Sequence, residues 1–166
     1  YSLNHNKQKL EAIDEKFNIK VVSPNFKLEY GLNVEDLEKR LDKLIRYSDP
    51  SKNLKTLFVW PEGVFSGYSF KEIQNFKKIF KKNFSENHFI LFGSNRFDEK
   101  RKGFYNSLII VNNHMEIMQE YRKQKLVPFG EFLPLEIILE KFGLKKITEG
   151  YGSFLKGDKQ ENIILD

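Results

Sequence analysis

The chain has 166 residues, a size typical of one globular domain, and its 40% of hydrophobic residues is enough for a folded core, which excludes wholesale disorder. Its 28 Lys and Arg exceed its 23 Asp and Glu by 28 − 23 = 5, and they are spread along the sequence rather than gathered in the basic block of a nucleic-acid-binding tail. There is no cysteine, so the sequence offers no disulfide, no thiolate metal ligand and no cysteine nucleophile.

The first elements in chain order are a strand and a helix. Residues 1–16 are polar and lack periodicity, so we predict a linker or frayed end before a domain at residues 17–166. The β-branched segment Ile19–Val22 predicts a strand that ends before Pro24. Asn33 is a good N-cap, and the apolar residues that follow it fall on one helical stripe: Val34, Leu37, Leu41, Leu44 and Ile45.

The strand–helix pattern then repeats. Thr56–Trp60 is a short continuous apolar run, typical of a strand buried on both faces, and it stops at Pro61–Gly63. Ser69 and Glu72 form a capping-box pair, which predicts a second helix with apolar residues at helical spacing: Phe70, Ile73, Phe76, Ile79 and Phe80.

Three further strands are predicted at His88–Gly93, Tyr105–Val111 and Met115–Tyr121, the last two joined by a tight turn at Asn112-Asn113. Leu135–Phe142 is predicted to form a short helix, and Asn162–Leu165 a strand. Strands alternating with helices in this order predict an α/β fold in which helices pack on a largely buried sheet.

Two regions carry side chains suited to chemistry. Glu62 directly follows the buried strand Thr56–Trp60, although a single Glu at a strand end is most often a solvated loop residue. Lys123 and Glu131 lie in a Pro- and Gly-punctuated loop after the last complete strand, a pattern that also fits a rigid turn with exposed charges. The aromatic and apolar content of that loop argues against a merely solvated loop.

These segments resemble a known superfamily. Trp60–Glu62 (Trp-Pro-Glu), Tyr105–Ser107 (Tyr-Asn-Ser) and the Tyr-x-Lys at Tyr121–Lys123 are similar to motifs of the nitrilase, or carbon–nitrogen hydrolase, superfamily. Leu126–Pro134, which reads Leu-Val-Pro-Phe-Gly-Glu-x-x-Pro, resembles more narrowly the apolipoprotein N-acyltransferase family. The resemblance covers roughly residues 17–166 and matches the front portion of the family's domain.

The resemblance implies a nitrilase-like α-β-β-α sandwich, incomplete in this chain, and a Glu-Lys-Cys triad. By motif position, Glu62 is expected to be the general base, Lys123 to stabilise the oxyanion, and Glu131 to be a further essential glutamate beside the site. Such enzymes transfer an acyl chain from a phospholipid, through a cysteine thioester, to the N-terminal amine of diacylglyceryl-cysteine lipoproteins. No metal or organic cofactor is implied, and the expected location is the bacterial inner membrane with this domain on the periplasmic side.

The missing cysteine is the main departure from the family. We expect the nucleophile, and a transmembrane portion that attaches the domain to the membrane, to lie outside these residues, which makes this fragment alone inactive. Two alternatives stay open: a soluble nitrilase-type amidase acting on a small amide, and a noncatalytic binding domain that has lost the nucleophile. His5, His88 and His114 lack metal-ligand spacing, so no metal site is predicted, and no nucleic-acid partner is indicated.

Overall fold

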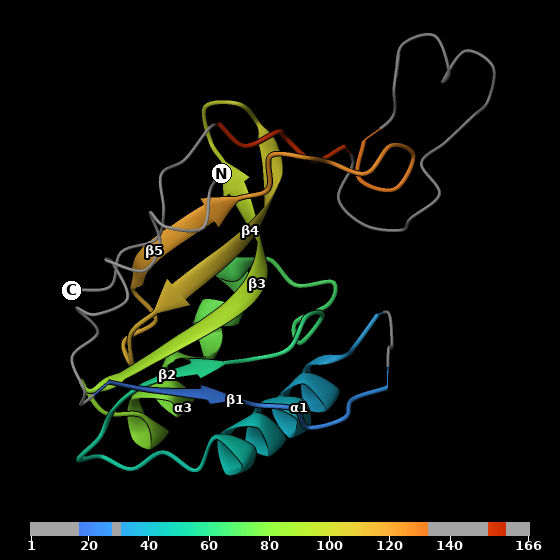
Figure 1. Ribbon diagram of the computed structural model, residues 1–166. Coiled ribbons are helices and arrows are strands. Elements are labelled where there is room, and N and C mark those ends of the chain that lie inside the picture. The colour runs from blue at the N-terminus through green and yellow to red at the C-terminus, as the bar shows by residue number, and fades with distance from the viewer. Residues whose placement is uncertain (1–16, 28–30, 133–152, 159–166) are drawn as a thin grey trace, which may run out of the picture.

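The computed structural model describes residues 17–27, 31–132 and 153–158, and its centre is one mixed five-stranded sheet (Figure 1). The strands lie in the order β1 (Phe17–Val21), β2 (Lys55–Val59), β3 (His88–Asp98), β4 (Gly103–Val111) and β5 (Ile117–Arg122). β1, β2 and β3 are parallel, whereas β4 is antiparallel to both β3 and β5. The predicted α/β class is therefore confirmed, and the part of the chain that the structure describes contributes this one sheet.

The first helix, α1 (Val34–Ser48), begins where the sequence indicates. The Asn33 side-chain oxygen accepts a hydrogen bond from the Asp36 N–H at 2.9 Å, which satisfies a donor that the first helical turn leaves free. Leu37, Leu41 and Leu44 are fully buried against the sheet. The apolar stripe read from the sequence is thus the face that packs on the core.

The second predicted helix is divided into three pieces: α2 (Phe70–Ile73), the 3-10 turn η2 (Gln74–Phe76) and α3 (Lys77–Asn83). Its capping box is present, and Glu72 Oε2 accepts hydrogen bonds from the N–H of Ser69 at 2.7 Å and from its hydroxyl at 2.6 Å. Phe70, Ile73 and Phe76 follow one another at intervals of three residues, which match the three residues per turn of a 3-10 helix. The tightened turn therefore keeps all three side chains on the buried side.

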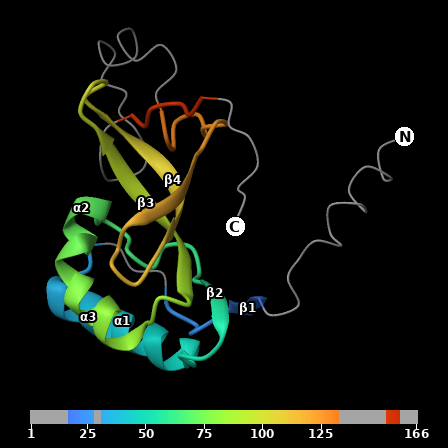
Figure 2. The same ribbon diagram turned by 90° about the vertical axis from the view of Figure 1, so that its left-hand side faces the viewer.

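The helices cover one face of the sheet, as Figure 2 shows. Strand side chains alternate between the two faces, and the helix side carries buried residues such as Phe58, Ile90, Phe92 and Ile109. The opposite face presents Ile19, Val21, Leu108 and Tyr121, all of which are exposed. None of the helices in the described ranges is long and apolar enough to cross a membrane.

β3 continues five residues beyond its predicted end at Gly93 and forms a long hairpin with β4. The added residues are largely polar, so they lack the apolar run by which the buried half of the strand was recognised. Asp98 closes the hairpin by accepting the N–H groups of Lys100 and Arg101, each at 2.9 Å. The predicted end segment 1–16, helix Leu135–Phe142 and strand Asn162–Leu165 lie outside the described residues.

Candidate active site

The sheet topology brings the ends of two distant strands to one edge. β2 runs parallel to β3, and two antiparallel pairings give β5 the same direction again. The loop that holds Glu62 and the loop that begins with Lys123 therefore both leave the carboxyl edge of the sheet, which is where α/β folds commonly build their sites.

Lys123 extends the pairing of β5 with β4 by one residue. Its N–H donates to the Asn106 carbonyl at 2.8 Å, next to the paired residues Ser107 and Arg122. Because side chains alternate along a strand, Asn106 and Lys123 lie together on the face away from the helices.

Glu131 joins this pair from the loop that follows β5. Its Oε1 accepts hydrogen bonds from Lys123 Nζ at 2.9 Å and from Asn106 Nδ2 at 2.7 Å. Its Oε2 accepts the Val127 N–H at 2.9 Å. One carboxylate oxygen thus holds two side chains of neighbouring strands, while the other ties the carboxylate to its own loop.

The loop has a compact main-chain structure that presents Glu131 in this position. The Glu131 N–H donates to the Val127 carbonyl at 2.8 Å, and Phe129 adopts a left-handed φ of 63° between Pro128 and Gly130. The Phe129 N–H donates to the Phe132 carbonyl at 2.8 Å. Pro128 restricts the chain at the tip, which lowers the entropy that the loop loses on folding.

A short segment from later in the chain, 153–158, runs beside the loop after β5 (Figure 1). The Phe154 N–H donates to the Glu131 carbonyl at 2.7 Å, and the Gly157 N–H donates to the Lys123 carbonyl at 3.0 Å. A Cβ atom at Gly157 would collide with the Arg122 carbonyl, so this close approach requires glycine. The two charged residues are therefore held through their main chain as well as their side chains.

The electrostatics of the pair favour an ionised carboxylate. Burial raises the pKa of Glu131, but hydrogen bonds from Lys123, the Val127 N–H and Asn106, together with the Lys123 charge, outweigh burial and lower that pKa below its ordinary value. The Glu131 side chain is 14% exposed and the Lys123 side chain 38%. The Lys123 side chain is thus anchored through its ammonium group and remains partly exposed to solvent.

Glu62 occupies the loop after β2 and is exposed. Within the described ranges its carboxylate makes no hydrogen bond or ion pair with Lys123 or Glu131. The structure therefore brings together two of the three residues singled out from the sequence and leaves Glu62 at the same edge of the sheet, with no hydrogen bond or ion pair to them among the described residues.

Asn106 is a site residue to which the sequence alone gave no role. It belongs to the Tyr-Asn-Ser segment that carries part of the resemblance, and that segment was the available indication. The Val127 N–H is a main-chain donor, and its role could not be predicted from the identity of the residue that carries it.

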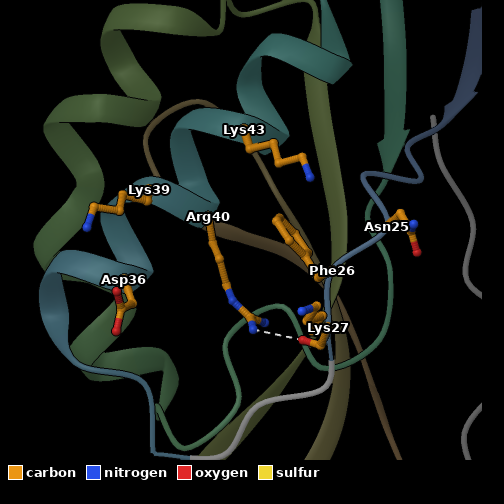
Figure 3. Close-up of a pocket in the computed structure, with 7 residues that line it drawn as sticks. All are labelled: Asn25, Phe26, Lys27, Asp36, Lys39, Arg40 and Lys43. Carbon is orange, nitrogen blue, oxygen red and sulfur yellow. Dashed lines mark hydrogen bonds between the residues drawn. The ribbon is translucent and has the colours of Figure 1, made fainter.

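A separate hollow of about 340 Å³ lies between α1 and the loop after β1 (Figure 3). Cations dominate its lining, and Arg40 Nη2 donates to the Lys27 carbonyl at 2.9 Å while its guanidinium lies 4.9 Å from the centre of the Phe26 ring. It lies beside the β1 end of the sheet, far in strand order from Lys123. Among the residues that the structure describes, no three His, Cys, Asp or Glu side chains are grouped so that they could hold a metal ion.

Comparison with known sequences finds relatives that share one name. An apolipoprotein N-acyltransferase of Rhodopseudomonas palustris is 28% identical over 159 residues, which cover 89% of this chain and 30% of that protein. An apolipoprotein N-acyltransferase of Bradyrhizobium diazoefficiens is 28% identical over 151 residues, covering 84% and 28%. The resemblance noted in the sequence is confirmed by these homologues, and the chain spans about 30% of the length of the curated relatives it matches. No family model matches the chain.

Comparison with solved structures finds several that resemble part of this chain. An N-terminal amidase is 21% identical, with a TM-score of 0.44, over 66% of this chain and 28% of that one. The Nit3 protein of Saccharomyces cerevisiae is 18% identical, with a TM-score of 0.42, over 65% and 45%. An amidase of Nesterenkonia sp. AN1 is 13% identical, with a TM-score of 0.47, over 87% and 49%. The likeness concerns the mixed α/β sheet and covers part of each neighbour.

Proposed function

We propose that this chain is part of an apolipoprotein N-acyltransferase, which moves an acyl chain from a phospholipid to the N-terminal amine of a diacylglyceryl-cysteine lipoprotein. The observation that carries the proposal is the Lys123–Glu131–Asn106 cluster, because it is built by the Tyr-Asn-Ser and Leu-Val-Pro-Phe-Gly-Glu segments on which the resemblance rests. The names of the relatives agree with it. The site would act at the bacterial inner membrane, on the periplasmic side.

The first half-reaction would form a thioester. Glu62 takes the proton of a cysteine thiol contributed from outside residues 1–166, and the thiolate attacks the ester carbonyl of the phospholipid. A carbon–sulfur bond forms, the carbonyl oxygen becomes an oxyanion, and collapse breaks the carbon–oxygen bond. The lysophospholipid leaves with the proton that Glu62 returns.

The second half-reaction would form the amide. The neutral amine of the lipoprotein attacks the thioester carbonyl, a carbon–nitrogen bond forms and the carbon–sulfur bond breaks. Glu62 takes the proton released by the amine and passes it to the departing sulfur. The same site thus serves both steps, with a new acyl acceptor in the second.

Lys123 is proposed to stabilise the oxyanion in both steps. A lysine ammonium has three N–H donors, and the Glu131 carboxylate and the main-chain bonds around it fix the position of the group while leaving donors for a substrate oxygen. A donor held in place before the reaction stabilises developing charge without reorganising during it. In this scheme Glu131 and Asn106 orient Lys123, and Glu62 moves the protons.

The test uses the whole protein that contains this chain, incubated with a labelled phospholipid, with thioester formation followed by mass spectrometry. Lys123→Met and Glu62→Gln are each expected to slow acylation by about 100-fold or more, the range measured for loss of an oxyanion donor or a general base. Lys125→Met is the matched control, because Lys125 is an exposed lysine of the same loop. Acylation of Lys123→Met at the wild-type rate would rule out the role given to Lys123.

A further inference from the structure

A second largely buried carboxylate, that of Glu120, lies on β5 on the helix-covered side of the sheet. Its Oε1 accepts a hydrogen bond from Ser107 Oγ at 2.8 Å and contacts Arg96 Nε at 3.4 Å. Its Oε2 accepts from Arg122 Nη2 at 3.3 Å. Ser107 lies on β4 and Arg96 on β3, so this one carboxylate ties three adjacent strands together.

The environment holds these groups firmly. The Glu120 side chain is 14% exposed. The guanidinium of Arg122 lies 4.4 Å from the centre of the Tyr105 ring, and that of Arg96 lies 5.3 Å from the centre of the Phe70 ring. Burial raises the pKa of Glu120, but hydrogen bonds from Ser107 and Arg122 and the charges of both arginines outweigh it and lower that pKa below its ordinary value.

Each partner of Glu120 is the direct chain neighbour of a residue on the opposite face, and two of these neighbours, Asn106 and Lys123, belong to the candidate active site. Arg96 follows Asn95, Ser107 follows Asn106, and Arg122 precedes Lys123. Asn95 and Asn106 are paired in the sheet, and the Lys123 N–H donates to the Asn106 carbonyl. Neighbouring side chains of a strand point to opposite faces, so a slip of one residue in β5 would carry Lys123 to the helix side.

We propose that Glu120 is a positioning residue: by holding Arg96, Ser107 and Arg122 in one register on the helix side, it keeps Lys123 beside Asn106 and Glu131 on the other side. The inference rests on the proposed function only in one respect, namely that the proposed function makes Lys123 the residue that stabilises the oxyanion. The geometry that it explains can be tested without any assay of acyl transfer.

The readout is the pKa of Glu131, measured by NMR titration of its side-chain carboxyl carbon in the folded protein. Glu120→Gln and Glu120→Ala are expected to raise this pKa toward the ordinary glutamate value, because Lys123 and Asn106 would no longer be held against the carboxylate. The direction of the change in the Glu131 pKa distinguishes a loss of positioning from a simple effect of charge. Removing a negative charge nearby would by itself make Glu131 easier to ionise and would lower its pKa.

Glu116→Gln is the matched control, since Glu116 is an exposed carboxylate just before β5 that accepts from Asn112 Nδ2 at 2.8 Å. It makes the same change of charge at the other end of the strand and is expected to leave the Glu131 pKa unraised. A purely structural role for Glu120 would lower the melting temperature while leaving the Glu131 pKa of the folded molecules unchanged.

Ser107→Ala covers the case in which both Glu120 variants fail to fold. It keeps all the charges and removes the hydroxyl donor to Glu120, so a smaller rise of the same sign is expected, with about tenfold faster exchange of the Lys123 amide proton as local opening becomes easier. A Glu131 pKa that stays at its wild-type value in every folded variant would overturn the proposal. Failure of the whole protein to transfer acyl chains would count against the proposed function and leave this result standing.

Discussion

The Glu131 carboxylate is held by an ammonium group, a side-chain amide and a main-chain N–H, each contributed by a different residue. All three donors favour its charged form. The folded-state pKa therefore lies below the value near 4.5 that an unperturbed glutamate has, and the carboxylate titrates at lower pH in the folded protein than in the unfolded chain.

Glu131 should accordingly make the stability of the protein depend on pH. Its contribution is fully present above the unfolded-state pKa and is lost as the pH falls through the lower folded-state pKa. Urea unfolding of the wild type and of Glu131→Gln between neutral and acid pH measures this. We expect the free energy of unfolding of the wild type to fall more steeply below about pH 5. Equal pH dependence in the two proteins would contradict the assigned hydrogen bonds.

Replacing Asn106 tests the third side chain of the cluster. Asn106→Ala removes a donor to a largely buried carboxylate, and the expected loss is about 1–3 kcal/mol in the free energy of unfolding. Asn95→Ala provides the comparison, because Asn95 is paired with Asn106 across the sheet and its side chain has no hydrogen bond within the described ranges. A loss no larger for Asn106→Ala than for Asn95→Ala would show that the amide adds nothing to stability.

Among the elements, α1 illustrates what local sequence can specify. Its start is set by the hydrogen bond that the Asn33 side-chain oxygen accepts from the Asp36 N–H, and its buried face by the spacing of its leucines. Asn33→Ala is expected to lower the free energy of unfolding by about 1 kcal/mol, whereas Asn33→Asp, which keeps an acceptor oxygen, should be close to the wild type. Chemical denaturation measures both, and equal losses in the two variants would show that the cap oxygen is not the cause.

The strands and the second helix show where local pattern is insufficient. The polar half of β3 is held by pairing with residues 103–107 of β4 in the hairpin, and it lacks the apolar run that marks the first half of the strand. The 3-10 turn at Gln74–Phe76 keeps the side chains of Phe70, Ile73 and Phe76 against the core. A pattern of apolar residues read as one continuous α-helix does not predict this turn. The order of the elements and the fold class could be predicted from the sequence, whereas these element boundaries depend on contacts between elements.

The candidate site was likewise only partly predictable from the sequence. Lys123 and Glu131 were identifiable because a motif places them together in one loop, and the structure joins them by a direct ion pair. The contact with Asn106 depends on the register of β4 against β5, which no local pattern states. The role of Glu62 stays a prediction, since its loop lies at the same edge but no hydrogen bond or ion pair joins its carboxylate to the pair in the described part of the chain.

For the molecule as a whole, the two faces of the sheet differ in how they are covered. Helices bury one face, whereas on the other Ile19 is 63% and Val21 is 74% exposed. A second sheet packed on this face is what the α-β-β-α arrangement would supply. Exposed apolar side chains on an edge strand otherwise favour association between chains.

Charged substitutions on this face should therefore change the oligomeric state of the 166-residue chain. The double variant Ile19→Lys with Val21→Lys is expected to sediment as a smaller species than the wild type at the same concentration. Val34→Lys is the control, because Val34 is also exposed but lies at the start of α1. Sedimentation velocity compares the three proteins, and association of the double variant at the wild-type level would exclude this face as the contact.

The hydrogen bonds from Phe154 and Gly157 to Glu131 and Lys123 also bear on the order in which the molecule is made. A ribosome adds residues one at a time from the N-terminus, so the five strands can pair before Phe154 has been synthesised. The loop after β5 gains its last main-chain partners only when that later segment emerges. During translation the sheet would therefore form first and the charged pair would be locked last, leaving the nascent chain folded but without a finished site.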